Sequence, residues 1–198
     1  MKVIGITGGV GSGKSEVLKY LERKHGAVIC QADIVARNLE KKGTICYRQI
    51  TEHFGTSILQ ENGRIDRGKL AGIVFSDPDE LKVLNRIVHP AVKKRILRKV
   101  REEQRRGTGL FVLEAALLLD DHYDEICDEV WYIYTEDPVR RKRLKLSRGY
   151  SDEKIDAIFA SQLTRDAFLG RCDRAIDNSR SFDDTCVQLE SILAKLNR

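Results

Sequence analysis

The stretch Gly8-Gly9-Val10-Gly11-Ser12-Gly13-Lys14-Ser15 decides the fold of this 198-residue chain. It matches the phosphate-loop pattern G-x-x-x-x-G-K-[ST]. Glycines let the backbone curl until successive N–H groups face one anion, and the helix that follows aims its positive end at the same anion. The lysine then places a charge on the β- and γ-phosphates, and the serine hydroxyl coordinates magnesium. The stretch therefore predicts a site for a nucleoside triphosphate, ATP, with Mg²⁺.

The residues on either side of the loop supply the context that the pattern requires. The apolar run 3–6 reads as a buried strand, and 15–24 reads as a helix that Gly26 ends. A glycine-rich turn with a solvated lysine would not need a strand before it and a helix after it. We therefore interpret the stretch as a true phosphate loop.

Four more apolar runs alternate with helical patterns along the chain. The runs 27–30, 110–113, 130–134 and 174–177 predict strands, and helices are predicted at 34–41, 47–54, 67–74, 78–104, 139–146, 152–163 and 183–196. Strands separated by helices imply parallel pairing with right-handed crossovers, and unbroken apolar strands suit a sheet covered on both faces. The expected fold is α/β of the P-loop NTPase class, with a five-stranded parallel sheet flanked by helices.

The lengths between the strands suggest how a single domain, 1–198, is organised. A core would consist of 1–37, 107–139 and 171–198. The segment 38–106 is mostly helical and too long for one crossover, so we interpret it as a helical lobe that binds the acceptor. The segment 140–170 is rich in arginine, is broken by Gly149 and suits a mobile lid.

Charge and composition narrow the class of partner. The net charge is +5 and the cations are spread along the chain, which favours small anionic partners over nucleic acid. No run reaches the roughly 18 apolar residues of a membrane span, and the N-terminus lacks the features of a signal peptide. Five cysteines without CxxC spacing indicate reduced thiols in the cytoplasm. We expect a monomer or a small homo-oligomer.

A phosphate loop alone does not separate kinases from other nucleotide hydrolases. The guanine motif N-K-x-D is absent, and 146–149 matches only the start of a transporter-ATPase signature. The short chain and the arginine-rich lid favour a small-molecule kinase. A nucleotide-dependent switch or binding module is the alternative from another class.

Asp33 follows the strand that ends at Cys30. Ligands of doubly wound sheets lie beyond the carboxyl ends of the strands, so a carboxylate there can accept the proton of an attacking hydroxyl. The other interpretation of Asp33 is an N-cap for the helix that begins near Ile34.

An ordered series of blocks resembles the dephospho-CoA kinase family, which catalyses the last step of coenzyme A synthesis. The series covers nearly the whole chain and consists of 4–15, Ala32-Asp33-Ile34-Val35-Ala36-Arg37, Gly63-Arg64-Ile65-Asp66-Arg67, Ile87-Val88-His89-Pro90, Gln162 and Ala175-Ile176-Asp177-Asn178-Ser179. The chain departs from the family pattern at Gln31, Ala116 and Leu119, and its lid arginine is displaced by one residue.

The resemblance implies phosphorylation of the ribose 3′-hydroxyl of dephospho-CoA by ATP. Asp33, Lys14 and Arg148 would be catalytic, with Arg140 and Arg143 as alternatives for the lid arginine. Ser15 would hold magnesium. ATP would contact Gly8, Gly9, Val10, Gly11, Ser12, Gly13, Lys14, Ser15, Glu16, Arg140 and Asn178. The acceptor would contact Thr7, Asp33, Arg64, His89, Glu114 and Gln162.

Several of these positions have structural alternatives. The step from His89 to Pro90 is also typical of a helix junction, because the residue before proline avoids helical angles. Asp66-Arg67 is also a helix start, and Glu114 is also suited to cap a following helix. The basic run 93–106 is a solvated helix face or a site for the acceptor's diphosphate.

Overall fold

In the computed structural model, which describes residues 1–196, the chain forms two units. The first contains residues 1–29 and the chain from Arg106 onward, and the second is Cys30–Arg105. Each unit has its own buried apolar side chains.

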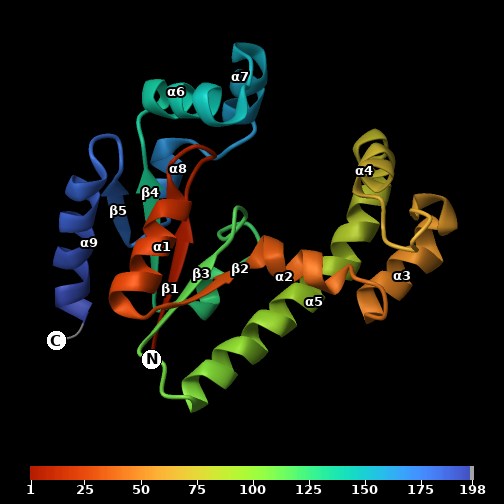
Figure 1. Cartoon of the computed structure of the whole chain (residues 1–198), viewed down its shortest axis with the longest axis horizontal. Helices are drawn as coiled ribbons and strands as arrows, with labels where there is room; N and C mark the ends of the chain where they lie inside the picture. Colours follow the sequence, from red (N-terminus) through yellow and green to blue (C-terminus); the bar gives the residue numbers. More distant parts are fainter. Residues whose placement is uncertain (197–198) are drawn as a thin grey trace. The chain divides into compact units, whose positions relative to one another are not determined.

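The sheet contains the five strands that the sequence predicts. They are β1 (Lys2–Thr7), β2 (Val28–Gln31), β3 (Leu110–Glu114), β4 (Glu129–Tyr134) and β5 (Arg174–Asp177). Their order is β2-β3-β1-β4-β5, and β1 pairs in parallel with both β3 and β4 (Figure 1). Because β1 is central, the loop that follows it leaves the carboxyl edge in the middle of the sheet.

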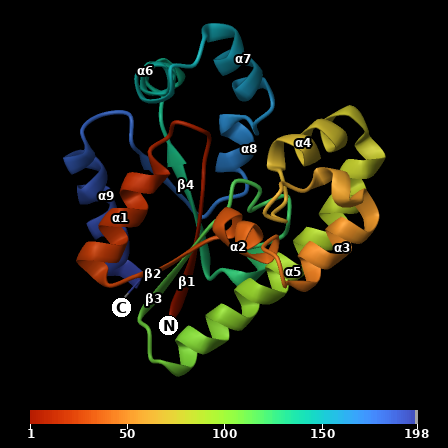
Figure 2. The same cartoon turned by 45° about the vertical axis from the view of Figure 1, so that its right-hand side comes forward.

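Helices of the first unit cover the sheet. They are α1 (Lys14–His25), α6 (Asp137–Arg148), α7 (Asp152–Ala160), α8 (Arg165–Leu169) and α9 (Phe182–Leu196), with the short 3₁₀ turn η2 (Asp124–Ile126). Helices α1 and α9 lie side by side in both views (Figures 1 and 2). Their Leu21 and Leu189 pack with Ile4 and Trp131 of the strands into one apolar core. On β4, Tyr132 stacks on Phe168 of α8 with ring centroids 4.5 Å apart.

The second unit is helical. It contains α2 (Ala32–Leu39), α3 (Ile45–Phe54), the 3₁₀ turn η1 (Thr56–Ile58), α4 (Arg67–Ser76) and α5 (Pro78–Arg105). Helices α2, α3 and α4 all pack on α5. Asp66 caps α4, because its carboxylate accepts hydrogen bonds from the N–H groups of Gly68 and Lys69. The helix-start interpretation of Asp66 is therefore confirmed.

Two local expectations differ from the structure. The helix predicted at 152–163 ends at Ala160, and a separate short helix, α8, begins after its N-cap Thr164. The His89–Pro90 step is not a helix junction, because α5 continues through Pro90. Proline removes one backbone donor, and long helical segments on both sides hold the rest of α5 in place.

None of the helices in residues 1–196 is both long enough and apolar enough to cross a membrane.

Candidate functional site

The phosphate loop joins β1 to α1 and has a backbone that only glycine adopts readily. Gly8, Gly11 and Gly13 have φ angles of 146°, 84° and 86°. A Cβ on Gly8 would lie 2.5 Å from the Ile133 carbonyl oxygen, and one on Gly13 would overlap the side-chain nitrogen of Asn178. The loop therefore packs closely against its neighbours. A larger residue at Gly8 or Gly13 would force neighbouring atoms to move.

Lys14 begins α1 and turns its ammonium group back toward the loop. Its Nζ donates hydrogen bonds to the carbonyl oxygens of Gly8 at 2.7 Å and Gly9 at 3.3 Å. Neutral carbonyls are weaker acceptors than phosphate oxygens, so a triphosphate in the loop would be a better partner for this cation.

Two side chains from neighbouring strand ends hold the loop in shape. The Ser12 carbonyl oxygen accepts from Thr135 Oγ1 at 3.0 Å and from Asn178 Nδ2 at 2.8 Å. Thr135 directly follows β4 and Asn178 directly follows β5, and both are buried. Thr185 of α9 in turn donates to Asn178 Oδ1 at 2.9 Å. Asn178 therefore positions the loop, and Thr135 does so as well, although Thr135 belongs to none of the predicted site residues.

Arg140 in the first turn of α6 and Gln162, which follows α7, also contact the loop. Arg140 Nε donates to the Val10 carbonyl oxygen at 3.1 Å. Its Nη2 and the Val10 N–H both reach Gln162 Oε1, at 2.5 and 3.3 Å. Arg143 Nη2 donates to the Asn178 carbonyl oxygen at 2.9 Å. Arg140 of the predicted lid thus contacts the loop directly, and Arg143 contacts Asn178, which holds the loop.

A cavity of about 300 Å³ opens beside Gly9, with Arg140 and Gln162 in its wall. Arg165 also lines it and lies over the Tyr134 ring, 4.4 Å from the ring centroid. The cavity combines cations with aromatic faces immediately next to the loop, so it can take a charged group attached to a flat ring.

Arg148 lies elsewhere on α6. It is exposed in the last turn, about 12 Å along the helix axis from Arg140 by the rise per residue. Its guanidinium carbon lies 5.8 Å from the Tyr150 ring centroid, and its hydrogen bond lowers the pKa of Tyr150. The structure brings Arg140 and Arg143 to the loop and does not bring Arg148 there.

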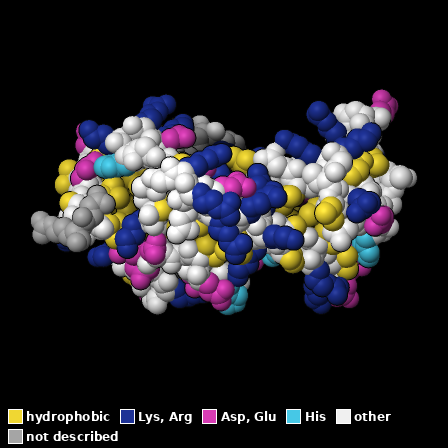
Figure 3. Space-filling view, turned by 90° about the horizontal axis from the view of Figure 1, so that it is seen from below, with side chains coloured by type: hydrophobic (Ala, Val, Ile, Leu, Met, Phe, Trp, Pro, Cys, Tyr) yellow, Lys and Arg dark blue, Asp and Glu magenta, His cyan; other side chains and the backbone are white. Residues whose placement is uncertain are grey.

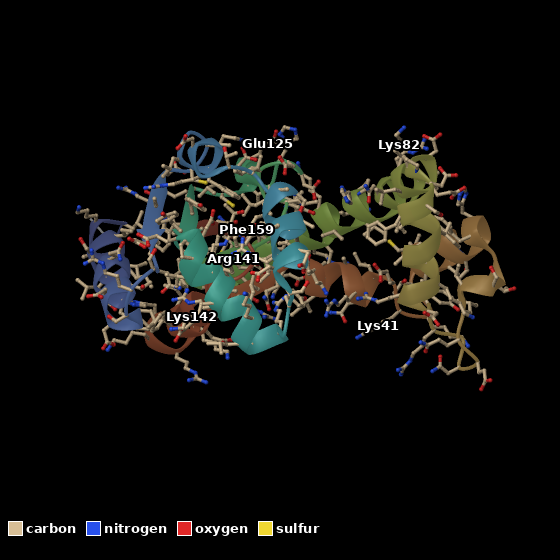
Figure 4. The ribbon with its side chains drawn as sticks, turned by 90° about the horizontal axis from the view of Figure 1, so that it is seen from above. Lys41, Lys82, Glu125, Arg141, Lys142 and Phe159 are labelled. Atoms are coloured by element: carbon tan, nitrogen blue, oxygen red, sulfur yellow. The ribbon has the colours of Figure 1, made fainter. Side chains whose placement is uncertain are left out.

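Helices α6 and α7 are tied together beyond the loop. Arg141 pairs with Asp152 at 2.8 Å and with Asp156, and it lies beside Phe159 of α7 (Figure 4). Arg140 also lies over the same ring, 4.1 Å from its centroid. These contacts between the two helices keep Arg140 and Gln162 together in the wall of the cavity beside Gly9.

Two buried hydroxyl groups without a hydrogen-bond partner indicate whether a triphosphate and magnesium would fit the loop. Thr7 Oγ1 and Ser12 Oγ are buried and have no hydrogen-bond partner within residues 1–196. Ser15 and Glu16 are exposed in the first turn of α1, where the helix end carries partial positive charge. Curled amides, one lysine and hydroxyl oxygens are the groups that bind Mg²⁺–nucleotide, so the residues fit.

Other predicted site residues occupy separate positions. In the second unit, Asp33 is exposed in the first turn of α2, whose N-cap is Gln31, so the cap interpretation of Asp33 is wrong. His89 is half-buried within α5, and Arg64 is exposed before α4. In the first unit, Glu114 ends β3 and turns follow it, so it caps no helix.

A sequence model of the family described as dephospho-CoA kinase matches residues 2–184. The chain belongs to the dephospho-CoA kinase family. As a member of that family it is a kinase, a phosphotransferase that acts on a small molecule.

Relatives of this dephospho-CoA kinase family member match nearly the whole of this chain. The dephospho-CoA kinase of Symbiobacterium thermophilum is 38% identical over 191 residues, which is 96% of this chain and 80% of the relative. Among solved structures, TT1252 from Thermus thermophilus has a TM-score of 0.83 at 29% identity and covers 98% of this chain and 97% of its own. The dephospho-CoA kinase from Campylobacter jejuni has a TM-score of 0.74 at 26% identity, with both chains fully covered.

The five cysteines and His25 of this family member are described by their burial and their partners. All five cysteines are free thiols, and burial raises the pKa of Cys127 to about 12 and of Cys172 to about 11. His25 pairs with Glu190 at 2.9 Å. Within the described residues, no group of three or more His, Cys, Asp or Glu side chains is arranged to hold a metal ion. Burial therefore disfavours the reactive thiolate form of Cys127 and Cys172.

Proposed function

We propose that this protein transfers the γ-phosphoryl group of ATP to the ribose 3′-hydroxyl of dephospho-CoA, giving CoA and ADP. The observation that carries the proposal is the phosphate loop with Lys14 bonded to its own carbonyls, in a chain of the dephospho-CoA kinase family. Phosphoryl transfer needs positioning and charge neutralisation more than covalent help, and this loop supplies both.

The loop would hold the triphosphate of ATP. Backbone N–H groups of 8–15 would face the phosphate oxygens, with Glu16 and Asn178 beside them, and Lys14 would exchange its two carbonyl partners for the β- and γ-phosphates. Magnesium, when bound, would neutralise charge between those phosphates, and Ser15 would be its protein ligand. Arg140, now bonded to the Val10 carbonyl oxygen, would approach the transferred group.

Asp33 would act as the general base. The oxygen of the 3′-hydroxyl attacks the γ-phosphorus, its proton passes to the Asp33 carboxylate, and the bond to the β-phosphate oxygen breaks to release ADP. Because the carboxylate is exposed in the first turn of α2 and Asp33 is not the N-cap residue, it is available to an acceptor.

The remaining acceptor contacts are proposals from the family blocks. Thr7, Arg64, His89, Glu114 and Gln162 would contact dephospho-CoA. The segment 38–106 would form the acceptor lobe and 140–170 the lid. A cytoplasmic location and a monomeric or small homo-oligomeric state belong to the same proposal.

An ADP-release assay with purified protein, ATP and Mg²⁺ tests the function. Dephospho-CoA should support many turnovers, whereas adenosine, AMP and shikimate should support far fewer. ADP release at the same rate without any acceptor would instead identify a hydrolase or a switch. A preference for AMP or shikimate would identify a different small-molecule kinase.

Two alanine variants compare Arg140 with Arg148 as the arginine that acts on the phosphates. Arg140→Ala should lower kcat about 10²-fold, because it removes a cation next to the transferred phosphoryl group. Arg148→Ala should change kcat little, because Arg148 is exposed against Tyr150. Steady-state kinetics of both variants measure the difference. A larger loss in Arg148→Ala would show that the lid rearranges to bring Arg148 to the phosphates.

A further inference from the structure

Arg140 is held more closely than a surface cation. Figure 3 shows Lys and Arg side chains lying in the open on one face of the molecule, whereas the Arg140 side chain is only 13% exposed. Each of its nitrogens donates a hydrogen bond, Nε to the Val10 carbonyl oxygen at 3.1 Å, Nη1 to Asp137 at 2.8 Å and Nη2 to Gln162 at 2.5 Å. A cation that has lost most of its water depends on such partners for its position.

The two faces of the Arg140 guanidinium have their own contacts. Its N–H groups all point outward in one plane, so hydrogen bonds alone leave the tilt of that plane free. The guanidinium carbon lies over the Phe159 ring, 4.1 Å from the ring centroid. The same group lies against Gly9 of the phosphate loop, where a Cβ would be 2.7 Å from the guanidinium carbon. Phe159 and the missing side chain at Gly9 therefore set the tilt.

The surroundings of Phe159 favour a role toward arginine over a role in the apolar core. Phe159 is half-buried, whereas the fully buried residue of α7 is Ile155. Its ring also lies 5.6 Å from the guanidinium carbon of Arg141 (Figure 4). The negative face of an aromatic ring attracts a guanidinium group, and an aliphatic side chain of similar size does not.

Phe159 and Gln162 reach Arg140 from the same end of α7. Gln162 follows the helix by two residues, and its Oε1 also accepts from the Val10 N–H at 3.3 Å. The ring therefore fixes the face of the guanidinium, and the amide fixes one edge of it. Because the Gln162 amide is bonded to the loop as well, the Arg140 position follows the position of the loop.

We infer that Phe159 is a positioning residue for phosphoryl transfer, which acts by holding the Arg140 guanidinium beside the phosphate loop. The inference rests on the proposed function, because it takes Arg140 to act on the transferred group. Asp137 is 67% exposed, so its carboxylate is the partner that a phosphate oxygen would replace. The ring and Gln162 would keep the rest of the guanidinium in place during that exchange, and a preorganised cation stabilises the transition state more than a mobile one.

Two substitutions separate the ring of Phe159 from the bulk of its side chain. Phe159→Leu keeps an apolar side chain and removes the ring face, whereas Phe159→Tyr keeps the face. Phe159→Leu should lower kcat with dephospho-CoA about 10-fold, because a largely desolvated contact between cation and ring is lost. KM for ATP should stay nearly unchanged, since the loop and Lys14 hold the triphosphate. Phe159→Tyr should keep the wild-type kcat.

A double-mutant cycle tests whether Phe159 acts through Arg140. In the Arg140→Ala background, Phe159→Leu should cause no further loss of kcat, because the cation that it positions is gone. Losses that multiply would show a separate structural role and overturn the inference. A raised KM for dephospho-CoA with unchanged kcat would also overturn it, since Phe159 would then be an acceptor contact. Wild-type turnover by Arg140→Ala would contradict it as well.

Asp156→Asn is the matched control on α7. Asp156 joins α7 to α6 through Arg141, which also pairs with Asp152 at 2.8 Å and so keeps one of its two partners. This variant loosens the contact between the helices and leaves the ring in place, so its kcat should equal that of the wild type. A loss as large as that of Phe159→Leu would show that loosening α7 is sufficient, against the inference.

Nuclear magnetic resonance gives a readout that does not depend on the reaction. In protein labelled with ¹⁵N-arginine, the Arg140 Nε–H should exchange slowly with water, because it is bonded to the Val10 carbonyl oxygen. The signal is assigned by its loss in Arg140→Lys. Phe159→Leu should speed the exchange about 10-fold, and Phe159→Tyr should not. Equal rates in all three proteins would refute the inference. If the wild type does not phosphorylate dephospho-CoA, the proposed function fails, and these rates still decide whether Phe159 holds Arg140.

Discussion

Replacing Lys14 by alanine is expected to lower turnover about 10²- to 10³-fold, because a preorganised charge next to the transferred group is lost. In the structure its ammonium group already lies over the loop, bonded to the carbonyl oxygens of Gly8 and Gly9. The loop itself is held by Thr135 and Asn178 through the Ser12 carbonyl oxygen. The variant should therefore fold normally and keep the shape of its loop.

Steady-state ADP release with dephospho-CoA measures this loss, and thermal unfolding confirms that the fold is retained. Lys19→Ala is the matched control, because Lys19 is an exposed lysine on the same helix, α1. It should behave as the wild type. Wild-type turnover by the Lys14→Ala variant would show that the loop does not hold the reacting phosphates.

Replacing Asp33 by asparagine should lower turnover about 10²- to 10⁴-fold, the usual contribution of a general base. Asparagine keeps the size of the side chain but cannot accept the proton from the acceptor hydroxyl. Because Asp33 is exposed and is not the N-cap residue of α2, the change should cost little stability. Binding of ATP, measured by calorimetry, should stay nearly unchanged.

A second exposed aspartate controls for the loss of one negative charge in the second unit. Asp79 lies in the first turn of α5, is largely exposed and pairs with Lys82 at 2.8 Å. Asp79→Asn should leave kcat and KM unchanged, because exposed ion pairs contribute little. If Asp33→Asn turns over like Asp79→Asn, the base must be another group.

Strands and loops that depend on a local sequence pattern could be predicted from the sequence. Each apolar run between helical segments became a strand. The middle residues of β1, β3 and β4 are buried on both faces, where a strand needs no polar alternation. The loop 8–15 was equally accessible, since its glycines and Lys14 stand at fixed spacing. The short helix α8 escaped prediction, because five residues between Thr164 and Gly170 carry no helical period.

Contacts between segments that are far apart in the sequence could not be predicted in the same way. Thr135 lies 123 residues from Ser12, yet its hydroxyl holds the loop through the Ser12 carbonyl oxygen. A polar residue directly after an apolar strand was the only signal that pointed to it. Among the arginines of 140–148, spacing could not tell which ones face the loop, because α6 carries cations on several faces.

The chain order alone settled the fold class, the phosphate loop and the family, since each depends on residues that are close together in the sequence or occur in a fixed series. Folding in three dimensions placed Arg140 against the loop and Arg143 against Asn178, excluded Asp33 as a cap, and gathered the cations between Arg37 and Arg67 around one pocket. The physical reason is that helix faces and loop closures decide which side chains meet, and these depend on the packing of the whole unit.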